Sequence, residues 1–218
     1  MKPLFLVLEG GEGAGKTTQT RLLAEWLTSM GHAVTATREP GGTSVGEVVR
    51  TVLLDRVDLA VPPESELLLV LAARAVFVRE VVRPALERGD IVVADRFSLS
   101  TLAYQGHGRG LDLEDVRRLD AFARGGCTPD LTLLLDLDPH EGARRQHAEG
   151  KRHDRIERAG QVFHARVAAG YRELARSEPG IERIDALGTP DAVHERVRAA
   201  VTRAFPGVVS GTFSAPSD

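Results

Sequence analysis

A glycine-rich run near the N-terminus carries the residue types that hold phosphate groups. Residues 10–17 read Gly-Gly-Glu-Gly-Ala-Gly-Lys-Thr and match the pattern G-x-x-x-x-G-K-[ST]. In such a run the glycines let backbone N–H groups converge on phosphate oxygens, the lysine bridges phosphates, and the threonine hydroxyl ligates Mg²⁺. We call residues 10–17 the phosphate loop. The residues predicted to bind a nucleoside triphosphate are Gly10, Gly11, Glu12, Gly13, Ala14, Gly15, Lys16, Thr17 and Thr18.

An aspartate at the end of a later apolar run is the second predicted metal ligand. Asp95 follows Ile-Val-Val-Ala at residues 91–94, where a carboxylate typically holds Mg²⁺ or its water beside such a loop. Asp136 and Asp138 also follow an apolar run and remain alternatives. The predicted metal site therefore combines Thr17 and Asp95.

These residues need a scaffold, and the hydrophobic pattern predicts an α/β one. Segments of helical periodicity separate short apolar runs at residues 4–8, 33–37, 91–94, 131–137 and 181–184. This alternation predicts a five-stranded parallel sheet with helices on both faces. Helices are expected over 17–30, 44–54, 64–82 and from a cap at Asp112 to Ala123, then after Pro139 and from Thr189-Pro190 onward. The spacing of Ser44 and Glu47 predicts a capping box.

Length and composition favour one soluble domain. The chain has 218 residues, which predicts a single domain over 1–205, and the Ser/Gly/Pro-rich stretch 206–218 predicts a flexible tail. The net charge of −3 gives no basic field for nucleic acid, and the first apolar run is too short to span a membrane. We expect a cytoplasmic protein with neither nucleic-acid nor membrane partners. Cys127 stands alone, which excludes an intramolecular disulfide.

A phosphate loop occurs in both molecular switches and kinases, and one absence favours a kinase. Guanine-specific switches usually carry an Asn/Thr-Lys-x-Asp motif. This chain has no asparagine, and none of its three lysines, Lys2, Lys16 and Lys151, lies two residues before an aspartate.

Further motifs make the chain resemble the bacterial thymidylate kinase family from Phe5 to about Phe205. Besides the phosphate loop they are Thr-Arg-Glu-Pro-Gly-Gly at 37–42, Ala-Ala-Arg at 72–74, Asp-Arg at 95–96 with Ser100, Ala-Tyr-Gln-Gly at 103–106 and Asp-Arg-Ile-Glu at 154–157. The resemblance implies a P-loop kinase fold with a short basic lid at about 148–158. It implies Mg²⁺-dependent transfer of the ATP γ-phosphoryl group to dTMP, giving dTDP and ADP. It also implies a homodimer packed through apolar helices, to which residues 67–82 contribute.

The resemblance also implies a role for each matching residue. Arg50 and Arg96 bind the phosphate of the acceptor, and Arg74 and Gln105 lie near its base. Glu12 lies near the sugar 3′-hydroxyl and Tyr104 packs against the sugar. The predicted substrate-binding residues are Glu39, Pro40, Arg50, Arg74, Arg96, Ser100, Tyr104 and Gln105, and the predicted catalytic residues are Lys16, Arg96, Glu12, Arg152 and Arg155.

Two departures leave alternatives open. Val70 stands where the family commonly has a phenylalanine that stacks on thymine, so base stacking is expected to be weaker or to be supplied by another ring, for which Phe77 and Phe97 are the candidates. In the lid, Glu149-Gly150 replaces a basic residue before glycine, so Arg144 and Arg145 on the preceding helix stay alternatives to Arg152 and Arg155. The rival functions are phosphorylation of dUMP, UMP or CMP, and a nucleotide switch that acts through a protein partner.

Overall fold

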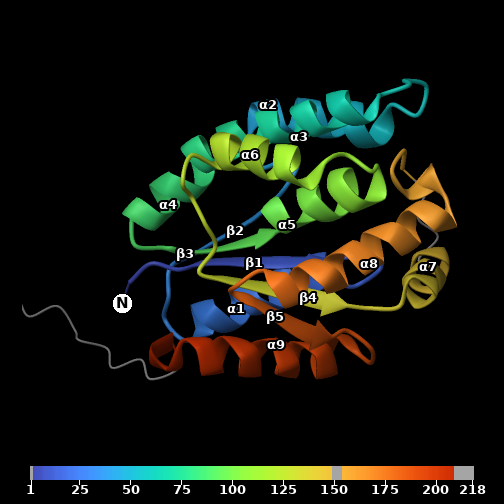
Figure 1. Ribbon diagram of the computed structural model, residues 1–218. Coiled ribbons are helices and arrows are strands. Elements are labelled where there is room, and N and C mark those ends of the chain that lie inside the picture. Colours follow the sequence, from blue (N-terminus) through green and yellow to red (C-terminus); the bar gives the residue numbers. More distant parts are fainter. Residues whose placement is uncertain (1, 149–153, 209–218) are drawn as a thin grey trace, which may run out of the picture.

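A single parallel sheet organises the chain. The computed structural model describes residues 2–148 and 154–208. Within these residues five parallel strands have the order β2-β3-β1-β4-β5, which confirms the predicted α/β class (Figure 1). The strands are β1 (Phe5–Gly10), β2 (Val34–Arg38), β3 (Ile91–Asp95), β4 (Leu131–Asp136) and β5 (Ile181–Asp185).

The strand register brings the predicted site residues to one edge. Leu8 of β1 pairs with Asp95 at the end of β3, and Asp95 pairs in turn with Arg38 at the end of β2. The chain leaves β1 for β2 on one side and later crosses to β4 on the other side, so strand order reverses beside β1. Ligands of open α/β sheets bind at this crevice, outside the carboxyl ends of the strands.

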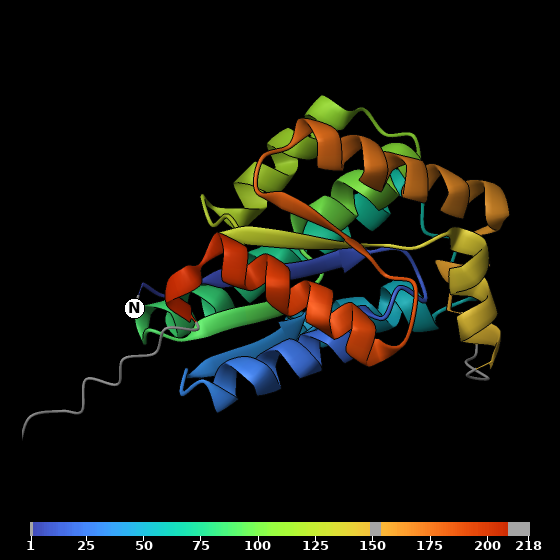
Figure 2. The same cartoon turned by 90° about the horizontal axis from the view of Figure 1, so that it is seen from below.

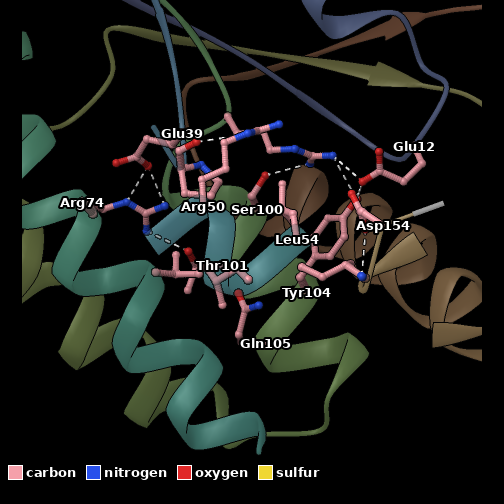
Figure 3. Close-up of a pocket in the computed structure, with 15 residues that line it drawn as sticks. Glu12, Glu39, Arg50, Leu54, Arg74, Ser100, Thr101, Tyr104, Gln105 and Asp154 are labelled. Atoms are coloured by element: carbon pink, nitrogen blue, oxygen red, sulfur yellow. Dashed lines mark hydrogen bonds and ion pairs between the residues drawn. The ribbon is translucent and has the colours of Figure 1, made fainter. Parts of the chain in front are cut away.

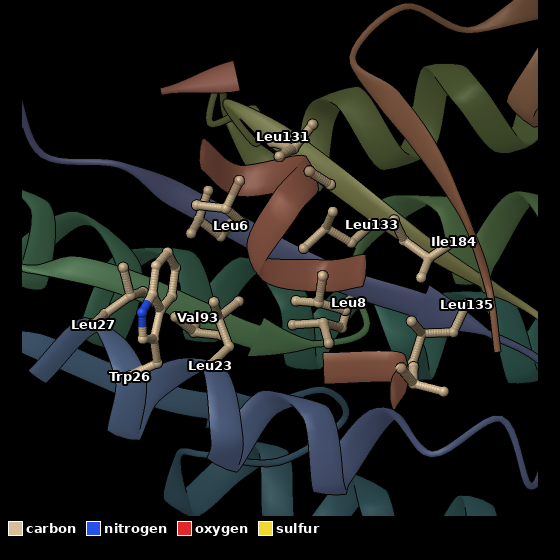
Figure 4. Packing of buried hydrophobic residues seen from close by; sticks show 14 of the residues in the cluster. Leu6, Leu8, Leu23, Trp26, Leu27, Val93, Leu131, Leu133, Leu135 and Ile184 are labelled. Atoms are coloured by element: carbon tan, nitrogen blue, oxygen red, sulfur yellow. The ribbon is translucent and has the colours of Figure 1, made fainter. Parts of the chain in front are cut away.

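The two faces of the sheet are covered by different helices. Helices α1 (Lys16–Ser29) and α9 (Pro190–Ala204) lie on one face, and the remaining long helices lie on the other (Figures 1 and 2). Alternation along β1 divides its side chains: Leu6 and Leu8 pack with Leu23 and Trp26 of α1, whereas Phe5 packs with the opposite layer (Figure 4). Burial on both faces explains why the central strands β1, β3 and β4 read as nearly continuous apolar runs, whereas the edge strands β2 and β5 are partly exposed.

The second layer contains the helices that surround the site. They are α2 (Ser44–Arg50), α3 (Pro63–Phe77), α4 (Arg83–Glu87), α5 (Ser98–Thr101), α6 (Leu113–Arg124), α7 (Pro139–Ala148) and α8 (Gln161–Ser177). Three π-helical segments, η1 (Thr51–Asp55), η2 (Val78–Val82) and η3 (Leu102–Gly108), continue α2, α3 and α5. No helix in the described ranges is long and apolar enough to cross a membrane.

Most predicted helix ends are confirmed, and one cap is corrected. Asp112 accepts the N–H groups of Glu114 and Asp115, and Thr189 accepts that of Ala192. Helix α2 begins at Ser44 as predicted, but its cap is Thr43, whose Oγ1 accepts from the N–H of Gly46. The predicted box between Ser44 and Glu47 is therefore wrong by one residue.

Two further segments differ from the prediction. The helix formed by α5 and η3 has no capping side chain in its own sequence, so the local pattern did not reveal it. Pro206–Val208, predicted to belong to the flexible tail, form the short 3₁₀ helix η5. Val208 is buried against the α1 and α9 core, and this burial offsets the cost of ordering the segment. The remainder of the predicted tail, 209–218, lies outside the described residues.

Candidate functional site

A pocket opens at the carboxyl edge of the sheet, beside the phosphate loop (Figure 3). We call it the central pocket. It is lined by all eight residues predicted to bind the acceptor, Glu39, Pro40, Arg50, Arg74, Arg96, Ser100, Tyr104 and Gln105, together with Glu12, Leu53, Leu54, Val70, Thr101, Asp154 and Ile156. These residues come from separate parts of the sequence, so the tertiary structure assembles the predicted set in one place.

The phosphate loop has the backbone that its glycines permit. Gly10, Gly13 and Gly15 have φ angles of 144°, 70° and 89°, in the region that L side chains rarely adopt. Lys16 is buried, and its Nζ donates to the carbonyl oxygen of Gly11 at 2.7 Å, across the inside of the loop. Burial lowers the pKa of Lys16, and the neighbouring Arg96 lowers it further. The loop thus concentrates cationic and N–H donors at one point.

The predicted metal ligands are in direct contact. Thr17 Oγ1 donates to Asp95 Oδ2 at 2.7 Å, at the point where α1 begins beside the end of β3. The alternatives are engaged elsewhere: Asp136 pairs with two arginines, and Asp138 accepts from the N–H of His140 at the start of α7. A hydroxyl and a carboxylate are hard oxygen donors of the kind that Mg²⁺ prefers.

Arg96 connects the phosphate loop to the central pocket. Its Nη2 donates to Glu12 Oε1 at 2.6 Å and to Tyr104 OH at 3.1 Å. Its Nη1 donates to the carbonyl oxygen of Gly10 at 3.0 Å and to the hydroxyls of Ser100 and Tyr171. The residue has a φ of 75°, the left-handed region that a non-glycine residue enters only at a cost. The strained backbone therefore aims a guanidinium between the two parts of the site.

The glutamate inside the phosphate loop is ionised and paired. Burial raises the pKa of Glu12, but the charges of Arg96 and Lys16 outweigh burial and hold this pKa at about 2. Tyr104 OH adds a hydrogen bond to Glu12 Oε1 at 2.7 Å. An unpaired negative charge beside a phosphate site is unfavourable. Arg96, Lys16 and Tyr104 offset this cost for Glu12.

A buried carboxylate that the sequence did not predict positions the Arg96 segment. Glu9 is fully buried, and its Oε1 accepts from the N–H groups of Phe97 and Ser100 at 2.8 and 3.0 Å. Its Oε2 accepts from the hydroxyls of Ser100 and Tyr171 at 2.5 and 3.0 Å. Glu9 thus caps the helix formed by α5 and η3 from a distant strand. A charged residue within an otherwise apolar strand was the only sequence signal.

The wall of the central pocket around Arg74 contains a buried ion network. Arg74 donates to Glu39 Oε2 from Nε at 2.9 Å and to Asp120 Oδ1 from Nη1 at 2.5 Å. Its Nη1 also donates to Thr101 Oγ1 at 2.8 Å. Asp120 was not identified from sequence, because 46 residues separate it from Arg74. The network fixes the guanidinium plane at the pocket wall.

The aromatic rings proposed to replace the missing phenylalanine do not line the central pocket. Phe77 and Phe97 are buried in the core beside β1, with Phe97 behind Arg74 at 5.0 Å from its guanidinium carbon. Among the described residues that line the pocket, Tyr104 is the one aromatic side chain, and Leu53, Leu54, Val70 and Ile156 supply aliphatic surface. The wall of the central pocket thus offers aliphatic surface and the Tyr104 ring, and neither Phe77 nor Phe97 contributes to it.

The arginines considered for the lid lie in different surroundings. Arg144 and Arg145 both pair with Glu141 on α7. Arg155 pairs with Glu66 Oε2 at 2.5 Å and donates to the carbonyl oxygen of Leu53, so the partners of its guanidinium lie outside the phosphate loop. Arg152 falls outside the described residues, as does the rest of the stretch 149–153 of the predicted lid.

A glycine contact that the sequence did not reveal places α7 against the phosphate loop. A Cβ atom on Gly142 would lie 2.3 Å from the carbonyl oxygen of Glu12, and one on Gly13 would lie 2.3 Å from the carbonyl oxygen of Gly142. Only glycine at both positions allows this approach. Helix α7, which leads into the predicted lid, is thus docked directly on the nucleotide-binding loop.

The buried Glu39 gives a prediction about pH. Burial raises the pKa of Glu39 from 4.5 to about 7, despite the attraction of Arg74. Between pH 4.5 and about pH 7 the native state therefore binds more protons than the unfolded state. The contribution of this carboxyl to the free energy of unfolding consequently falls as the pH rises through this range. We expect Glu39→Gln to remove this pH-dependent loss of stability. The unfolding free energy of the variant minus that of the native protein should therefore increase by up to about 3 kcal/mol between about pH 5 and about pH 8.

Urea denaturation of both proteins at the two pH values measures this difference. Glu47→Gln is the control, because the exposed Glu47 has a lowered pKa and stays ionised across this range. A difference that is the same at both pH values for Glu39→Gln would show that the carboxyl does not titrate there.

Comparison with known proteins agrees with this geometry. The family model described as thymidylate kinase matches residues 8–197. A thymidylate kinase of Deinococcus radiodurans is 50% identical over 202 residues, covering 91% of this chain and 96% of that one. One of Gloeobacter violaceus is 50% identical over 200 residues, covering 91% and 94%. The crystal structure of thymidylate kinase from Ehrlichia chaffeensis superposes with a TM-score of 0.74 at 31% identity, over 92% of this chain and 100% of that one. A phosphate loop joined through Arg96 to a pocket of this composition, in a chain so similar over its length, identifies a member of the thymidylate kinase family.

Proposed function

We propose that this chain phosphorylates dTMP with ATP by holding the two nucleotides on either side of Arg96. Membership of the family makes it a phosphotransferase that converts dTMP and ATP into dTDP and ADP. The observation that supports the assignment of residues is the contact of Arg96 Nη2 with Glu12 Oε1, which joins the nucleotide loop to the central pocket. Both substrates are polyanions, so catalysis depends on bringing their charges together.

The reaction needs little proton chemistry. A phosphate oxygen of dTMP attacks the γ-phosphorus of ATP in line, the bond from that phosphorus to the β–γ bridging oxygen breaks, and ADP leaves with the electron pair. The attacking monoester has a second pKa of about 6, so it is mostly ionised near neutral pH and requires no strong general base. The protein's task is therefore positioning and charge compensation.

The site residues divide this task between them. Lys16 now donates to the Gly11 carbonyl, and ATP phosphates would take over this donor inside the loop. Arg96 and Arg50 face the central pocket, where their planar guanidinium groups match a phosphate bidentately. Arg50 Nη1 donates to the carbonyl oxygen of Pro40 at 3.0 Å, which ties it to the loop after β2. These arginines compensate the acceptor charge.

Thr17 and Asp95 are the residues that would hold Mg²⁺. Their oxygens already lie 2.7 Å apart, and Asp95 is buried at the end of β3 beside the loop. In the described part of the chain no group of three or more His, Cys, Asp or Glu side chains forms a metal cage by itself. This fits an ion that completes its shell with water and phosphate oxygens, and whose chemistry is to offset charge on the transferred group.

A coupled assay of ADP release tests the substrate assignment. The protein is supplied with ATP, Mg²⁺ and, separately, dTMP, dUMP, UMP or CMP, and the diphosphate product is identified. Turnover that is fastest with dTMP supports the proposal. Preference for another monophosphate supports the rival acceptor, and acceptor-independent hydrolysis without a phosphorylated product supports the nucleotide switch.

We propose a homodimer formed through α2, α3 and α6, which pack side by side (Figure 1). These helices expose large apolar side chains, namely Val45, Val48, Leu68, Leu119 and Phe122, the last 88% exposed. Of the predicted stretch 67–82, Leu68 belongs to this face, whereas Leu67, Leu71 and Phe77 are buried in the chain's own core. Burying such a face against a second copy removes apolar area from water.

Light scattering of the purified protein measures the mass that this arrangement predicts. The native chain should have about twice the monomer mass, and Phe122→Asp should shift it toward the monomer, because a charge is costly inside an apolar interface. Val162→Asp, which charges another exposed apolar position, on α8, is the control. A monomeric native protein would contradict the proposal. The predicted cytoplasmic location stays a prediction.

A further inference from the structure

A buried carboxylate outside the central pocket gathers donors from three residues. Glu66 lies in the first turn of α3 and is 0% exposed. Its Oε1 accepts from Gln105 Nε2 at 2.9 Å and from Arg109 Nε at 3.0 Å. Its Oε2 accepts from Arg109 Nη2 at 2.9 Å and from Arg155 Nη2 at 2.5 Å. Four donors fill the acceptor sites of the carboxylate, so the group is fully satisfied.

Three hydrogen bonds join Arg155 to residues far from it in the sequence. Its Nη2 pairs with Glu66, its Nε donates to the carbonyl oxygen of Leu53 at 2.8 Å, and its backbone N–H donates to that of Leu54 at 3.0 Å. Leu53 and Leu54 both line the central pocket. The arginine therefore fastens its own segment to the η1 wall of that pocket.

The two residues beside Arg155 contribute directly to the central pocket. Asp154 and Ile156 both line it (Figure 3). The Asp154 carboxylate accepts from the N–H groups of Ile156 and Glu157, each at 2.8 Å, which closes a tight turn. Gln105, the third partner of Glu66, lines the pocket as well. The Glu66 carboxylate thus holds two parts of the pocket wall, Gln105 directly and the segment 154–156 through Arg155.

Charge balance alone does not require Arg155. Burial raises the pKa of Glu66, but the hydrogen bonds from Arg109, Gln105 and Arg155 outweigh burial and lower it. Arg109 already pairs with Glu66 through two nitrogens, which neutralises the carboxylate. The second guanidinium is therefore surplus to the charge of Glu66, whereas its bonds to Glu66 and Leu53 join the segment 154–156 to α3 and η1.

We propose that Arg155 is a positioning residue for the acceptor nucleotide, which acts by docking Asp154 and Ile156 into the wall of the central pocket through Glu66 and Leu53. The proposal rests on the proposed function and replaces the catalytic role predicted for Arg155 from sequence. Its guanidinium donates to atoms outside the phosphate loop, and in an aliphatic pocket the position of Ile156 contributes directly to the fit of the base. A displaced wall weakens dTMP binding and leaves the nucleotide loop unchanged.

Arg155→Gln tests this separation of binding from chemistry. Calorimetric titration with dTMP should show a dissociation constant raised by about tenfold, while the ATP KM and the kcat at saturating dTMP change by less than about threefold. Arg117→Gln is the matched control, because it removes another 2.5 Å ion pair, with Glu178, away from the pocket. The control should leave the dTMP dissociation constant unchanged.

A double-mutant cycle with Glu66→Gln shows whether the two side chains act through each other. Their effects on dTMP binding should be strongly non-additive, since either substitution releases the same wall. Three outcomes overturn the proposal. If the kcat of Arg155→Gln falls more than about a hundredfold at unchanged dTMP affinity, Arg155 is a catalytic residue. If Arg155→Gln has a lower melting temperature but binds dTMP as the native protein does, the ion pair is only structural, and additive effects in the cycle show that the two side chains do not act through each other.

The calorimetry also separates this proposal from the proposed function. It measures dTMP binding without turnover, so a native protein that binds dTMP and does not phosphorylate it contradicts the proposed function while the comparison of variants still decides the role of Arg155. A native protein that fails to bind dTMP overturns both.

Discussion

Lys16→Ala should abolish most of the turnover and leave the protein folded. The Lys16 ammonium is the cation of the phosphate loop, and its loss leaves the charge that develops on the β- and γ-phosphates uncompensated. Removing one such preorganised group typically lowers kcat by two to three orders of magnitude, so we expect a fall of about a thousandfold. Steady-state kinetics with ATP and dTMP measure this effect.

The stability of Lys16→Ala should change far less than its activity. Because the pKa of Lys16 is lowered on burial, the native state binds this proton less tightly than the unfolded state, and the charged lysine destabilises the fold near neutral pH. Losing the single hydrogen bond to Gly11 acts in the other direction. We expect the unfolding free energy of Lys16→Ala to stay within about 1 kcal/mol of the native value.

Arg50→Ala is the matched comparison on the acceptor side. Arg50 faces the central pocket and makes no contact with the phosphate loop in the described structure, so its removal should raise the dTMP KM more than it lowers kcat. Small and equal effects of Lys16→Ala and Arg50→Ala on both constants would contradict the division of roles between the two residues.

The second large effect concerns Arg96, whose backbone and side chain can be separated by experiment. Arg96→Ala and Arg96→Gly both remove the guanidinium that contacts Glu12, Tyr104 and the Gly10 carbonyl. We expect kcat/KM to fall by about a thousandfold or more in both, because positioning and charge compensation are lost together. The two variants should be equally inactive.

Their stabilities should differ in an unusual order. At most positions glycine is less stable than alanine, but residue 96 has a φ of 75°, which alanine adopts only with strain. Arg96→Gly should therefore be more stable than Arg96→Ala by about 1 kcal/mol in urea denaturation. An alanine variant as stable as the glycine variant would show that the backbone at this position is relaxed.

Buried residues hold the strained backbone at Arg96 in place. Glu9 holds the N–H groups of Phe97 and Ser100, immediately after Arg96, so the carboxylate fixes the backbone that the arginine's φ angle distorts. Strain of this kind persists only where surrounding contacts over-determine it, and it concentrates at functional sites. The buried network of Glu9, Ser100 and Tyr171 supplies those contacts.

The parts of the site that could be predicted are those with local signals. The phosphate loop reads directly from its glycines, Lys16 and Thr17, because its chemistry needs backbone freedom followed by a helix N-terminus within a few residues. Asp95 was predicted from its position after an apolar strand, and it meets Thr17 across 78 residues. The acceptor residues were predicted through family resemblance, and their shared place in one pocket agrees with it.

The residues that were missed act through partners far away in the chain. Glu66 was not identified because its donors lie 39 to 89 residues further on. Gly142 resembles any helical glycine until the carbonyl of Glu12 is placed 2.3 Å from its absent Cβ. Likewise, Phe77 and Phe97 are aromatic near the right positions, and only the packing shows that they face the core.

The sequence by itself determined the α/β class, the phosphate loop and the types of side chain available to bind two nucleotides, because hydrophobic period and glycine spacing act over a few residues. The tertiary structure alone decided which charges neutralise each other: Arg96 with Glu12, Arg74 with Glu39 and Asp120, and Arg155 with Glu66. The physical reason is that burying a charge is costly unless a partner arrives at hydrogen-bond distance, and that partner is supplied by the meeting of distant elements.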